Sequence, residues 1–342
     1  MYRDHTVGVV VPAYNEEGFV GDVIATMPAF VDRIYPVDDG SSDGTWAEIR
    51  EYVTAPGAAR PDGDTGAQAS TDADHVPVTD GGGSCVVPLR HETNHGVGAA
   101  IKTGYRRALA DDVDVVAVMN GDGQMDPDVL SRLLDPIVEG RADYAKGDRL
   151  HSQAAVEGMS RFRLFGNALL TATTRGATGY WHLTDSQNGY TAIAGDTLDA
   201  VAFDDCYEDY GFLNDFLAAL NDCDARVVDV PHAAVYGDEQ SSIDSVRFVP
   251  SVFALLGRTF CRRITSQYVV HDFHPLVLCY LLGGVGLTSS VGAVGAALGP
   301  LDGERALIGG LLALLLFLVG AVALTLGMAF DVRENAHLGV EP

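Results

Sequence analysis

The sequence predicts an α/β protein: a mainly parallel sheet with helices on both faces, followed by a C-terminal two-helix transmembrane hairpin. Two observations predict this class. Through the first two thirds of the chain, continuous apolar segments alternate with helical segments, as in a parallel sheet covered on both sides. Near the C-terminus stand two uncharged segments, each longer than the roughly 20 residues with which a helix crosses a bilayer.

Five strands are expected, each rich in apolar residues, and most run into turns of Gly, Asp or Asn. They cover residues 7–14, 33–39, 85–91, 113–120 and 142–148, with helices from about residue 16 and near 94–109. Ligands bind at the carboxyl ends of strands in such sheets, so the polar turns after the first, second and fourth strands should converge on one crevice. No G-x-G-x-x-G follows the first strand, which argues against a dinucleotide oxidoreductase.

The chain divides into three predicted parts. The first is interrupted at 54–84 by a segment rich in Gly, Pro and Asp, which is expected to be a flexible acidic insertion without chemistry. The region before the first span mixes apolar and basic residues, as in a helix that lies in the membrane interface. The parts are a soluble domain at 1–240, an interfacial region at 241–270, and a hairpin at 271–333 with spans at about 275–299 and 306–330.

The basic residues near the spans predict the orientation. Arg258, Arg262 and Arg263 precede the first span, whereas the short link between the spans carries one Arg. The positive-inside rule then places the large domain in the cytoplasm. The sequence therefore predicts a multi-pass protein of the cell membrane with a cytoplasmic soluble domain.

The chain is strongly acidic, since 22 Lys and Arg stand against 47 Asp and Glu, for a net charge of −25. Such a surface repels nucleic acid, so that class of partner is excluded. The acidic residues are spread along the chain, which favours a protein from a high-salt cytoplasm. Five cysteines show no paired C-x-x-C spacing and are expected to be reduced and mostly buried.

The turn after the fourth strand is unusually polar. Asn120, Asp122, Gln124 and Asp126 alternate with small residues and Met125 where the apolar strand ends. Asn, Asp and Gly favour turns for backbone reasons alone. Alternatively, oxygen donors at alternate positions suit Mg or Mn, which bind through one or two carboxylates plus the phosphates of a substrate. The turn by itself leaves both interpretations open.

Six segments stand in order along the first two thirds of the chain: VVVPAYNEE (9–17), VDDGSSDGT (37–45), NHGVGAAIKTG (94–104), NGDGQMDP (120–127), KGDR (146–149) and DSQNGYTAI (185–193). Together they resemble the motif series of the inverting family 2 glycosyltransferases, which have a GT-A (Rossmann-like) fold. Within that family the chain is most similar to the dolichyl- and polyprenyl-phosphate mannose or glucose synthases, some of which carry a C-terminal membrane hairpin. The resemblance implies a hexosyltransferase that uses a nucleotide-diphosphate sugar.

The resemblance assigns the donor side of the site. Asp122 and Gln124 match the metal positions of the D-x-D type motif, which implies Mg or Mn held against the diphosphate. Asn120 stands where that motif has its first acid, so it brings no charge to the metal. Aromatic rings pack on a base, and carboxylates accept hydrogen bonds from ring N–H groups and ribose hydroxyls. The nucleotide-sugar-binding positions are Pro12, Tyr14, Glu16, Asp39, Asn94, Lys102, Asn120 and Asp122.

The resemblance also assigns the acceptor side. Four cations match positions that receive a lipid phosphate, and Arg suits bidentate phosphate contact. Each of them could instead pair with one of the many carboxylates of this surface. Asp185 and Gln187 lie in a loop that would face the acceptor, although Asp185 could merely fix that loop. The four cations are Lys146, Arg149, Arg161 and Arg163.

Catalytic roles are expected for Asp122 and Asp215, and three functions remain open. Transfer to polyprenyl phosphate needs no base, because a phosphate monoester with a second pKa of about 6 is already ionised. Transfer to a hydroxyl of a lipid-linked saccharide needs a base, and Asp215 stands where many family 2 enzymes carry their catalytic acid residue. Asp215 could also be a helix cap or a solvated residue. The third function is a non-catalytic nucleotide-sugar-binding subunit, suggested by Asn120.

Overall fold

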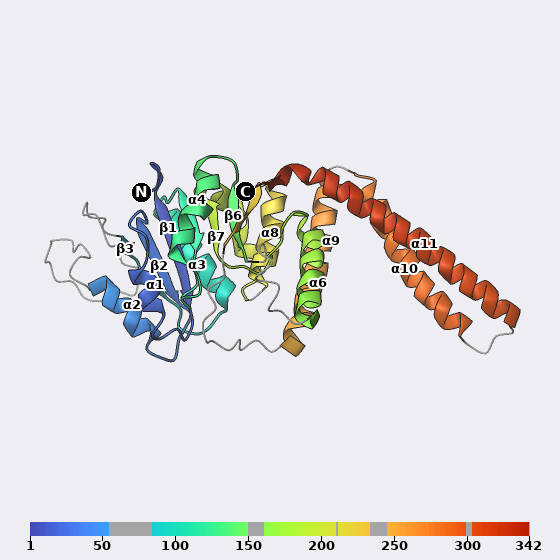
Figure 1. Ribbon diagram of the computed structural model, residues 1–342, viewed down its shortest axis with the longest axis horizontal. Helices are drawn as coiled ribbons and strands as arrows, with labels where there is room; N and C mark the ends of the chain where they lie inside the picture. Colours follow the sequence, from blue (N-terminus) through green and yellow to red (C-terminus); the bar gives the residue numbers. More distant parts are fainter. Residues whose placement is uncertain are drawn as a thin grey trace.

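Figure 1 shows a sheet flanked by helices, with two long helices that extend away from it. The computed structural model describes residues 1–54, 84–149, 161–209, 211–232, 245–271, 273–298 and 303–341. The expected insertion at 54–84 lies, apart from its two ends, outside these described residues.

The described residues form one nine-stranded sheet of order β3-β2-β1-β5-β7-β6-β8-β9, and β4 also pairs with β2. Strand β7 runs antiparallel to β5 and β6, whereas the other pairs are parallel, so the expectation of a mainly parallel sheet is confirmed. The strands are β1 (Val7–Ala13), β2 (Arg33–Asp38), β3 (Cys85–Val86), β4 (Leu89–Arg90), β5 (Val115–Val118), β6 (Tyr144–Asp148), β7 (Thr191–Ala194), β8 (Val227–Pro231) and β9 (Gly339–Val340).

Helices cover both faces of the sheet, as predicted. Successive side chains of a strand point to opposite faces, so Val10 packs in a core with α3 and α8, while Val9 packs in a second core with α1 and α4. The helices of this domain are α1 (Val20–Ala25), α2 (Thr45–Thr54), α3 (Val97–Ala110), η1 (Pro127–Val129), α4 (Leu130–Val138), α6 (Arg161–Thr178), α7 (Gly195–Ala200), η2 (Phe203–Asp205) and α8 (Phe212–Asp222).

Some element boundaries differ from the predicted ones. The expected strand at 85–91 is divided into β3 and β4, and Pro88 lies between them. Proline has no N–H to donate to a ladder, so it interrupts the pairing. The first helix begins at Val20 rather than near residue 16. Strands β7, β8 and β9 were not anticipated, because four, five and two residues give little periodic signal.

The region before the hairpin forms α9 (Ser245–Thr265) and a π-helical turn, η3 (Ser266–His271). Helix α9 packs against α6 and α8. Val252 and Leu256 are buried in that contact, while Arg258 is exposed. The predicted helix before the first span is therefore present, and its position in a membrane interface stays a prediction.

Two helices of the described chain, α10 (Leu276–Ala297) and α11 (Gly303–Glu334), are long and apolar enough to cross a membrane. Only 22% and 11% of their most apolar windows are buried. Large apolar side chains such as Leu282 and Val291 are instead exposed. This is not the pattern of a core helix in a soluble domain, and it agrees with the predicted spans at 275–299 and 306–330.

Small residues line the contact between α10 and α11. Gly283, Gly286 and Ser290 are buried on α10, and Ala313, Gly320 and Gly327 are buried on α11. A Cβ placed on Gly320 would lie 2.8 Å from the backbone nitrogen of Leu287. The two backbones therefore approach closely, which is how apolar helices associate in lipid.

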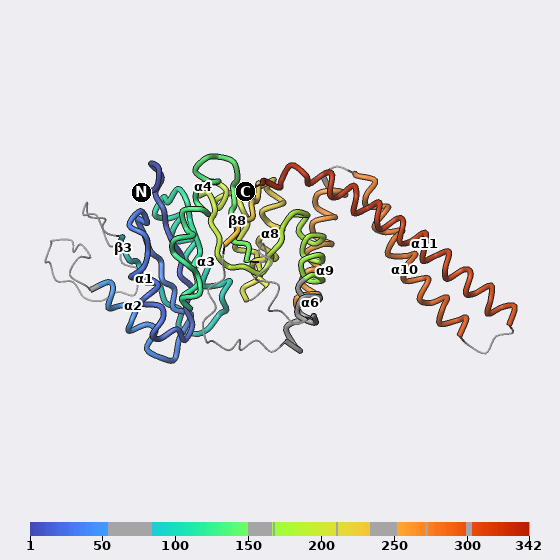
Figure 2. Tube along the Cα trace, in the orientation of Figure 1, coloured from blue at the N-terminus to red at the C-terminus, as the bar shows by residue number. Residues whose placement is uncertain are grey.

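The chain returns to the sheet after α11. Strand β9 pairs parallel to β8, with Val227 opposite Gly339. Figure 2 shows the C-terminus beside α8 and β8, close to the point where the hairpin leaves the domain. Both ends of the hairpin thus lie on the side of the soluble domain.

Candidate functional site

Three polar turns meet at one edge of the sheet. Strands β2, β1 and β5 are neighbours and parallel, so their carboxyl ends share that edge. The Asp39 N–H donates to Ala13 O at 2.9 Å, and the Gly121 N–H donates to Pro12 O at 3.1 Å. Asn15, at a left-handed φ of 57°, accepts from the Ser42 N–H. The predicted convergence of these turns is therefore present.

The turn after β1 presents an aromatic ring to solvent. Pro12 is buried at the end of β1, whereas Tyr14 is 46% exposed. Glu16 follows in a turn held by its backbone N–H, which donates to Thr45 Oγ1 at 2.8 Å. A fixed backbone with an exposed ring is suited to stacking on a planar base.

Asp39 organises the segment that leads into α3. The Asp39 side chain is buried, and its Oδ1 lies 2.6 Å from His91 Nδ1. The same carboxylate accepts from the backbone N–H groups of His95 and Gly96. Asn94, just before them, is exposed. Asp39 thus joins the turn after β2 to the loop that carries Asn94.

Lys102 lies apart from these turns. It is 1% exposed, and its ammonium donates to the carbonyl oxygens of Asp204 and Cys206. Glu208 Oε1 lies 3.9 Å from it. The described contacts of this ammonium tie α3 to the loop before α8, and they do not bring it to the other predicted donor-side residues.

The turn after β5 is shaped by Gly123, which has a φ of 70°. Asp122 Oδ1 accepts from the Gln124 backbone N–H at 3.0 Å, which fixes the backbone between these two predicted metal ligands. Asp126 accepts from the Asp128 N–H and caps the short helix that follows. Backbone bonds therefore fix the turn, and its oxygens are hard ligands of the kind that Mg and Mn prefer.

The segment 184–189, here called the acceptor loop, adjoins this turn. A Cβ placed on Gly189 would lie 3.4 Å from Asn120 Oδ1. The Tyr190 hydroxyl donates to Asp126 O at 3.1 Å. Gln187 Nε2 donates to Asn214 Oδ1 at 3.1 Å, which ties the loop to α8.

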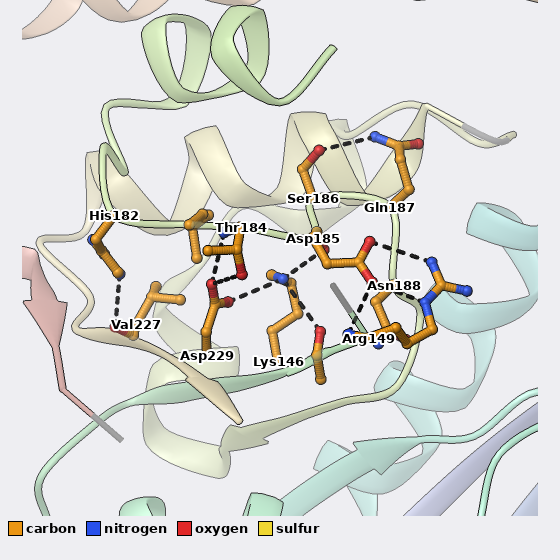
Figure 3. Close-up of polar contacts among 12 residues, drawn as sticks. Lys146, Arg149, His182, Thr184, Asp185, Ser186, Gln187, Asn188, Val227 and Asp229 are labelled. Atoms are coloured by element: carbon orange, nitrogen blue, oxygen red, sulfur yellow. Dashed lines mark hydrogen bonds and ion pairs between the residues drawn. The ribbon is translucent and has the colours of Figure 1, made fainter. Parts of the chain in front are cut away.

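Figure 3 shows Lys146 beneath the acceptor loop, between that loop and β8. The residue is fully buried, and its Nζ lies 3.0 Å from Asp229 Oδ1. The same ammonium donates to Asp185 O. A buried cation already bound to a carboxylate and a carbonyl supports the loop from below.

Arg149 binds Asp185 from the other side, as Figure 3 also shows. Its Nε and Nη2 donate to the two carboxylate oxygens at 2.8 and 3.2 Å. Burial alone raises the pKa of Asp185, but the hydrogen bond and charge of Arg149, with the charge of Lys146, bring that pKa below its ordinary value. The Arg149 side chain is 41% exposed, so part of it reaches solvent beside the loop.

Arg161 and Arg163 fall in the first turn of α6, but their side chains lie outside the described part of the chain. Their predicted contact with a lipid phosphate therefore stays a prediction.

Asp215 lies in the first turn of α8 and is 6% exposed. Its Oδ2 accepts from the Tyr207 N–H at 3.1 Å. Its Oδ1 accepts from the Thr259 hydroxyl and lies 3.2 Å from Arg262 Nη2, both on α9. Both carboxylate oxygens thus contact the protein itself.

Several residues around the acceptor loop were not predicted. Asp229 Oδ2 accepts from the N–H and the hydroxyl of Thr184 at 2.7 and 2.8 Å. Asn188 Nδ2 lies 2.8 Å from His232 Nε2. The only sequence signal was an acidic residue inside the apolar segment VVDVP, which forms β8.

Comparison with protein families gives one match, to the model described as Glycosyl transferase family 2, over residues 8–62 and 65–199. The chain is 28% identical over 196 residues to a UDP-N-acetylglucosamine–dolichyl-phosphate N-acetylglucosaminyltransferase of Methanococcus voltae, covering 57% of this chain and 72% of that protein. It is 27% identical over 234 residues to an undecaprenyl-phosphate mannosyltransferase of Micrococcus luteus, covering 65% and 80%.

Solved structures similar to this chain include mannosyl-3-phosphoglycerate synthase from Rubrobacter xylanophilus, with a TM-score of 0.49 and 16% identity, covering 79% of this chain and 77% of that chain. Another is glucosyl-3-phosphoglycerate synthase from Mycobacterium tuberculosis, solved with Mn2+, UDP and glucosyl-3-phosphoglycerate. Its TM-score is 0.48 at 18% identity, covering 76% of this chain and 80% of that chain.

Proposed function

Because this chain belongs to glycosyl transferase family 2, we propose that it moves a hexose from a nucleotide-diphosphate sugar to the phosphate of a polyprenyl lipid. It is a glycosyltransferase, and its two exposed apolar helices support a membrane protein. The observation that carries the proposal is the meeting of three polar turns with the acceptor loop at one edge of the sheet. Donor and acceptor would then lie side by side.

The donor binds over the turns after β1, β2 and β5 in this proposal. Tyr14 stacks on the base, and the loop ordered by Asp39 closes one side of the pocket. Relatives named for dolichyl and undecaprenyl phosphate support the lipid acceptor. The base and the sugar depend on pocket shape and are left to experiment.

A divalent ion, Mg or Mn, fits the donor set of the turn after β5. No group of three or more His, Cys, Asp or Glu able to hold a metal occurs in the described ranges, so these residues form no closed protein cage. Asp122 and Gln124 instead offer oxygens that would share an ion with the diphosphate. When bound there, the ion stabilises the charge that develops on the leaving diphosphate.

The reaction on the acceptor side needs no base. An ionised phosphate oxygen attacks the anomeric carbon opposite the diphosphate, so the new bond forms as the old one breaks and the configuration inverts. Arg149, a partly exposed cation next to the acceptor loop, would contribute its positive charge to that phosphate. The contacts of Asp215 with Tyr207 and α9 favour this acceptor over a saccharide hydroxyl.

The test uses the purified protein in detergent and high salt, with Mg or Mn and a panel of labelled nucleotide sugars. Label that reaches the organic phase is measured with and without polyprenyl phosphate. We expect metal-dependent transfer to the bare lipid phosphate, with an inverted linkage. Asp122→Ala should abolish it, while Asp215→Asn should keep most of it at saturating acceptor, because the amide oxygen still accepts from the Tyr207 N–H and the amide NH2 can donate to the Thr259 hydroxyl.

Two other outcomes point to the other functions. Transfer only to a lipid-linked saccharide, abolished by Asp215→Asn, would establish Asp215 as the base. Donor binding without any transfer, unchanged in Asp122→Ala, would identify a binding subunit and reject the enzyme.

A further inference from the structure

We propose that the hairpin does more than anchor the enzyme: its domain-side end positions the acceptor loop through α9 and α8. Arg263 and Asp331 are the positioning residues of this connection. The inference rests on the proposed function only for its consequence on catalysis. The connection itself consists of contacts that can be tested without a substrate.

The connection begins with a buried ion pair. Arg263 and Asp331 are both 0% exposed, and the guanidinium donates to the two carboxylate oxygens at 2.9 and 2.7 Å. Arg263 also donates to the carbonyl oxygens of Gly176 and Ala177, at the end of α6. One side chain of α9 therefore holds the end of the second membrane helix and the end of α6 together.

Asp331 is surrounded by further donors. The hydroxyls of Tyr268 and Tyr280 donate to it at 3.3 and 3.2 Å, and Asn335 Nδ2 donates at 2.9 Å. Asn335 Oδ1 in turn accepts from Asn221 Nδ2, on the last turn of α8. A buried network that is satisfied at so many points fixes one geometry, because any shift leaves charged groups without partners.

The connection continues along α9. Arg262, the neighbour of Arg263, lies 3.2 Å from Asp215 Oδ1 in the first turn of α8. Thr259, one turn earlier, donates to the same oxygen at 3.3 Å. The last turn of α8 is held by Gln267, which donates to Asn221. Helix α8 is therefore tied at both ends to the segment that carries Arg263.

The final step reaches the acceptor loop. Asn214 precedes Asp215 on α8, and its Oδ1 accepts from Gln187 Nε2 at 3.1 Å and from the Thr174 hydroxyl at 3.3 Å. Gln187 lies two residues before Gly189, which faces Asn120. A displacement of α8 would thus move the acceptor loop relative to the turn after β5, which carries Asn120.

Hydrogen exchange of the full chain in detergent tests the connection. Asp331→Asn keeps the shape of the side chain but removes its charge. We expect the amides of residues 207–217 to exchange about tenfold faster, including the Tyr207 amide that binds Asp215, while β1 is unchanged. Glu334→Gln is the control, because it removes a charge from the same helix end without touching the buried pair. Faster exchange confined to 174–179 and α11, or raised equally everywhere, would overturn the proposal.

A second variant tests the same path from the surface. Arg262→Gln removes the contact with Asp215 while leaving Arg263 in place. Coupling is reciprocal, so exchange should rise both at 207–217 and around Asn335. In the double variant Arg262→Gln with Asp331→Asn, the increase in exchange should be smaller than the sum of the two single increases. If Arg262→Gln changes neither segment, the proposal is wrong, even where Asp331→Asn does not fold. Where Asp331→Asn does fold, an additive double variant also overturns the proposal.

The catalytic consequence is measured separately. In Asp331→Asn the KM for polyprenyl phosphate should rise about tenfold, while the affinity for the nucleotide sugar stays unchanged. A wild-type protein that transfers nothing to polyprenyl phosphate would reject the proposed function, yet the exchange experiment would still decide the connection. An unchanged KM together with changed exchange would reject the role of the pair in positioning the acceptor.

Discussion

Burial decides the role of each basic side chain at the site. Lys146 and Arg149 stand three residues apart in KGDR, yet the first is fully buried and the second is 41% exposed at its side chain. Arg262 and Arg263 are neighbours, yet one reaches Asp215 and the other Asp331. A sequence motif names such cations together, but their partners differ because strands and helices turn successive side chains in different directions.

Lys146 is expected to stabilise the fold rather than bind phosphate. In Lys146→Met the Asp229 carboxylate would remain buried without its cation, which should lower the free energy of unfolding by about 3–5 kcal/mol. Denaturant unfolding in detergent measures this. The double variant Lys146→Met with Asp229→Asn should recover part of the loss, since the amide oxygen still accepts from Thr184. A Lys146→Met protein as stable as the wild type but unable to use lipid phosphate would return Lys146 to the acceptor site.

Asn120 is expected to limit metal affinity. Asn120→Asp adds a carboxylate to the turn that holds Asp122 and Gln124, and metal affinity grows with ligand charge, here by about tenfold. The measured quantity is the Mg or Mn concentration that gives half-maximal donor binding in calorimetry. Ala110→Asp adds the same charge at the exposed last residue of α3, outside the predicted donor site, and should leave that concentration nearly unchanged. Equal effects of the two variants would show a general charge effect and no ligand at position 120.

Among the elements, the pairing of the two hairpin helices depends most on close contact between their backbones. Helices α10 and α11 expose large apolar side chains outward and bury small ones against each other. Lipid chains are as apolar as leucine, so hydrophobic burial does not drive this pairing and packing must. The contact also brings Asp331 back to the domain, where it meets α9.

Gly320→Leu should separate the two helices. A side chain there would meet the backbone of Leu287 and Gly286, and overpacking of this kind costs about 1–3 kcal/mol. Thermal unfolding in detergent should show a lower midpoint. Gly310→Leu, on the same helix with nothing within 4 Å of its Cβ position, is the matched control and should match the wild type. If the two variants behave alike, the close contact is absent in solution.

The whole molecule combines a net charge of −25 with a hairpin that leaves the soluble domain and returns to it on the same side. The hairpin would therefore hold the soluble domain at the membrane. The negative charges on the surface of this domain repel one another and also repel other anions. Its cytoplasmic position rests on the positive-inside rule and remains a prediction.

Salt is expected to stabilise the protein. Dissolved ions screen the repulsion between surface carboxylates. The range of this repulsion falls from about 10 Å at 0.1 M salt to about 3 Å at 1 M salt. The urea midpoint in detergent should therefore rise as KCl increases towards molar concentrations. A neutral osmolyte at matched osmolality controls for general exclusion from the surface. Full stability in dilute buffer, with no further gain from KCl, would contradict the hypothesis of a high-salt cytoplasm.

Local patterns in the sequence predict the class of sheet, the three converging turns and the two long apolar helices. These follow from patterns that lie close together along the chain: apolar strands that end in polar turns, and uncharged segments of sufficient length. Which charges are buried, and which groups they bind, depends on the tertiary fold. Asp229 lies beside Lys146 on the neighbouring strand, and Asp331 binds Arg263 across 68 residues of sequence. Such pairs carry no local signal, because the chain brings them together only when the sheet and the hairpin have formed.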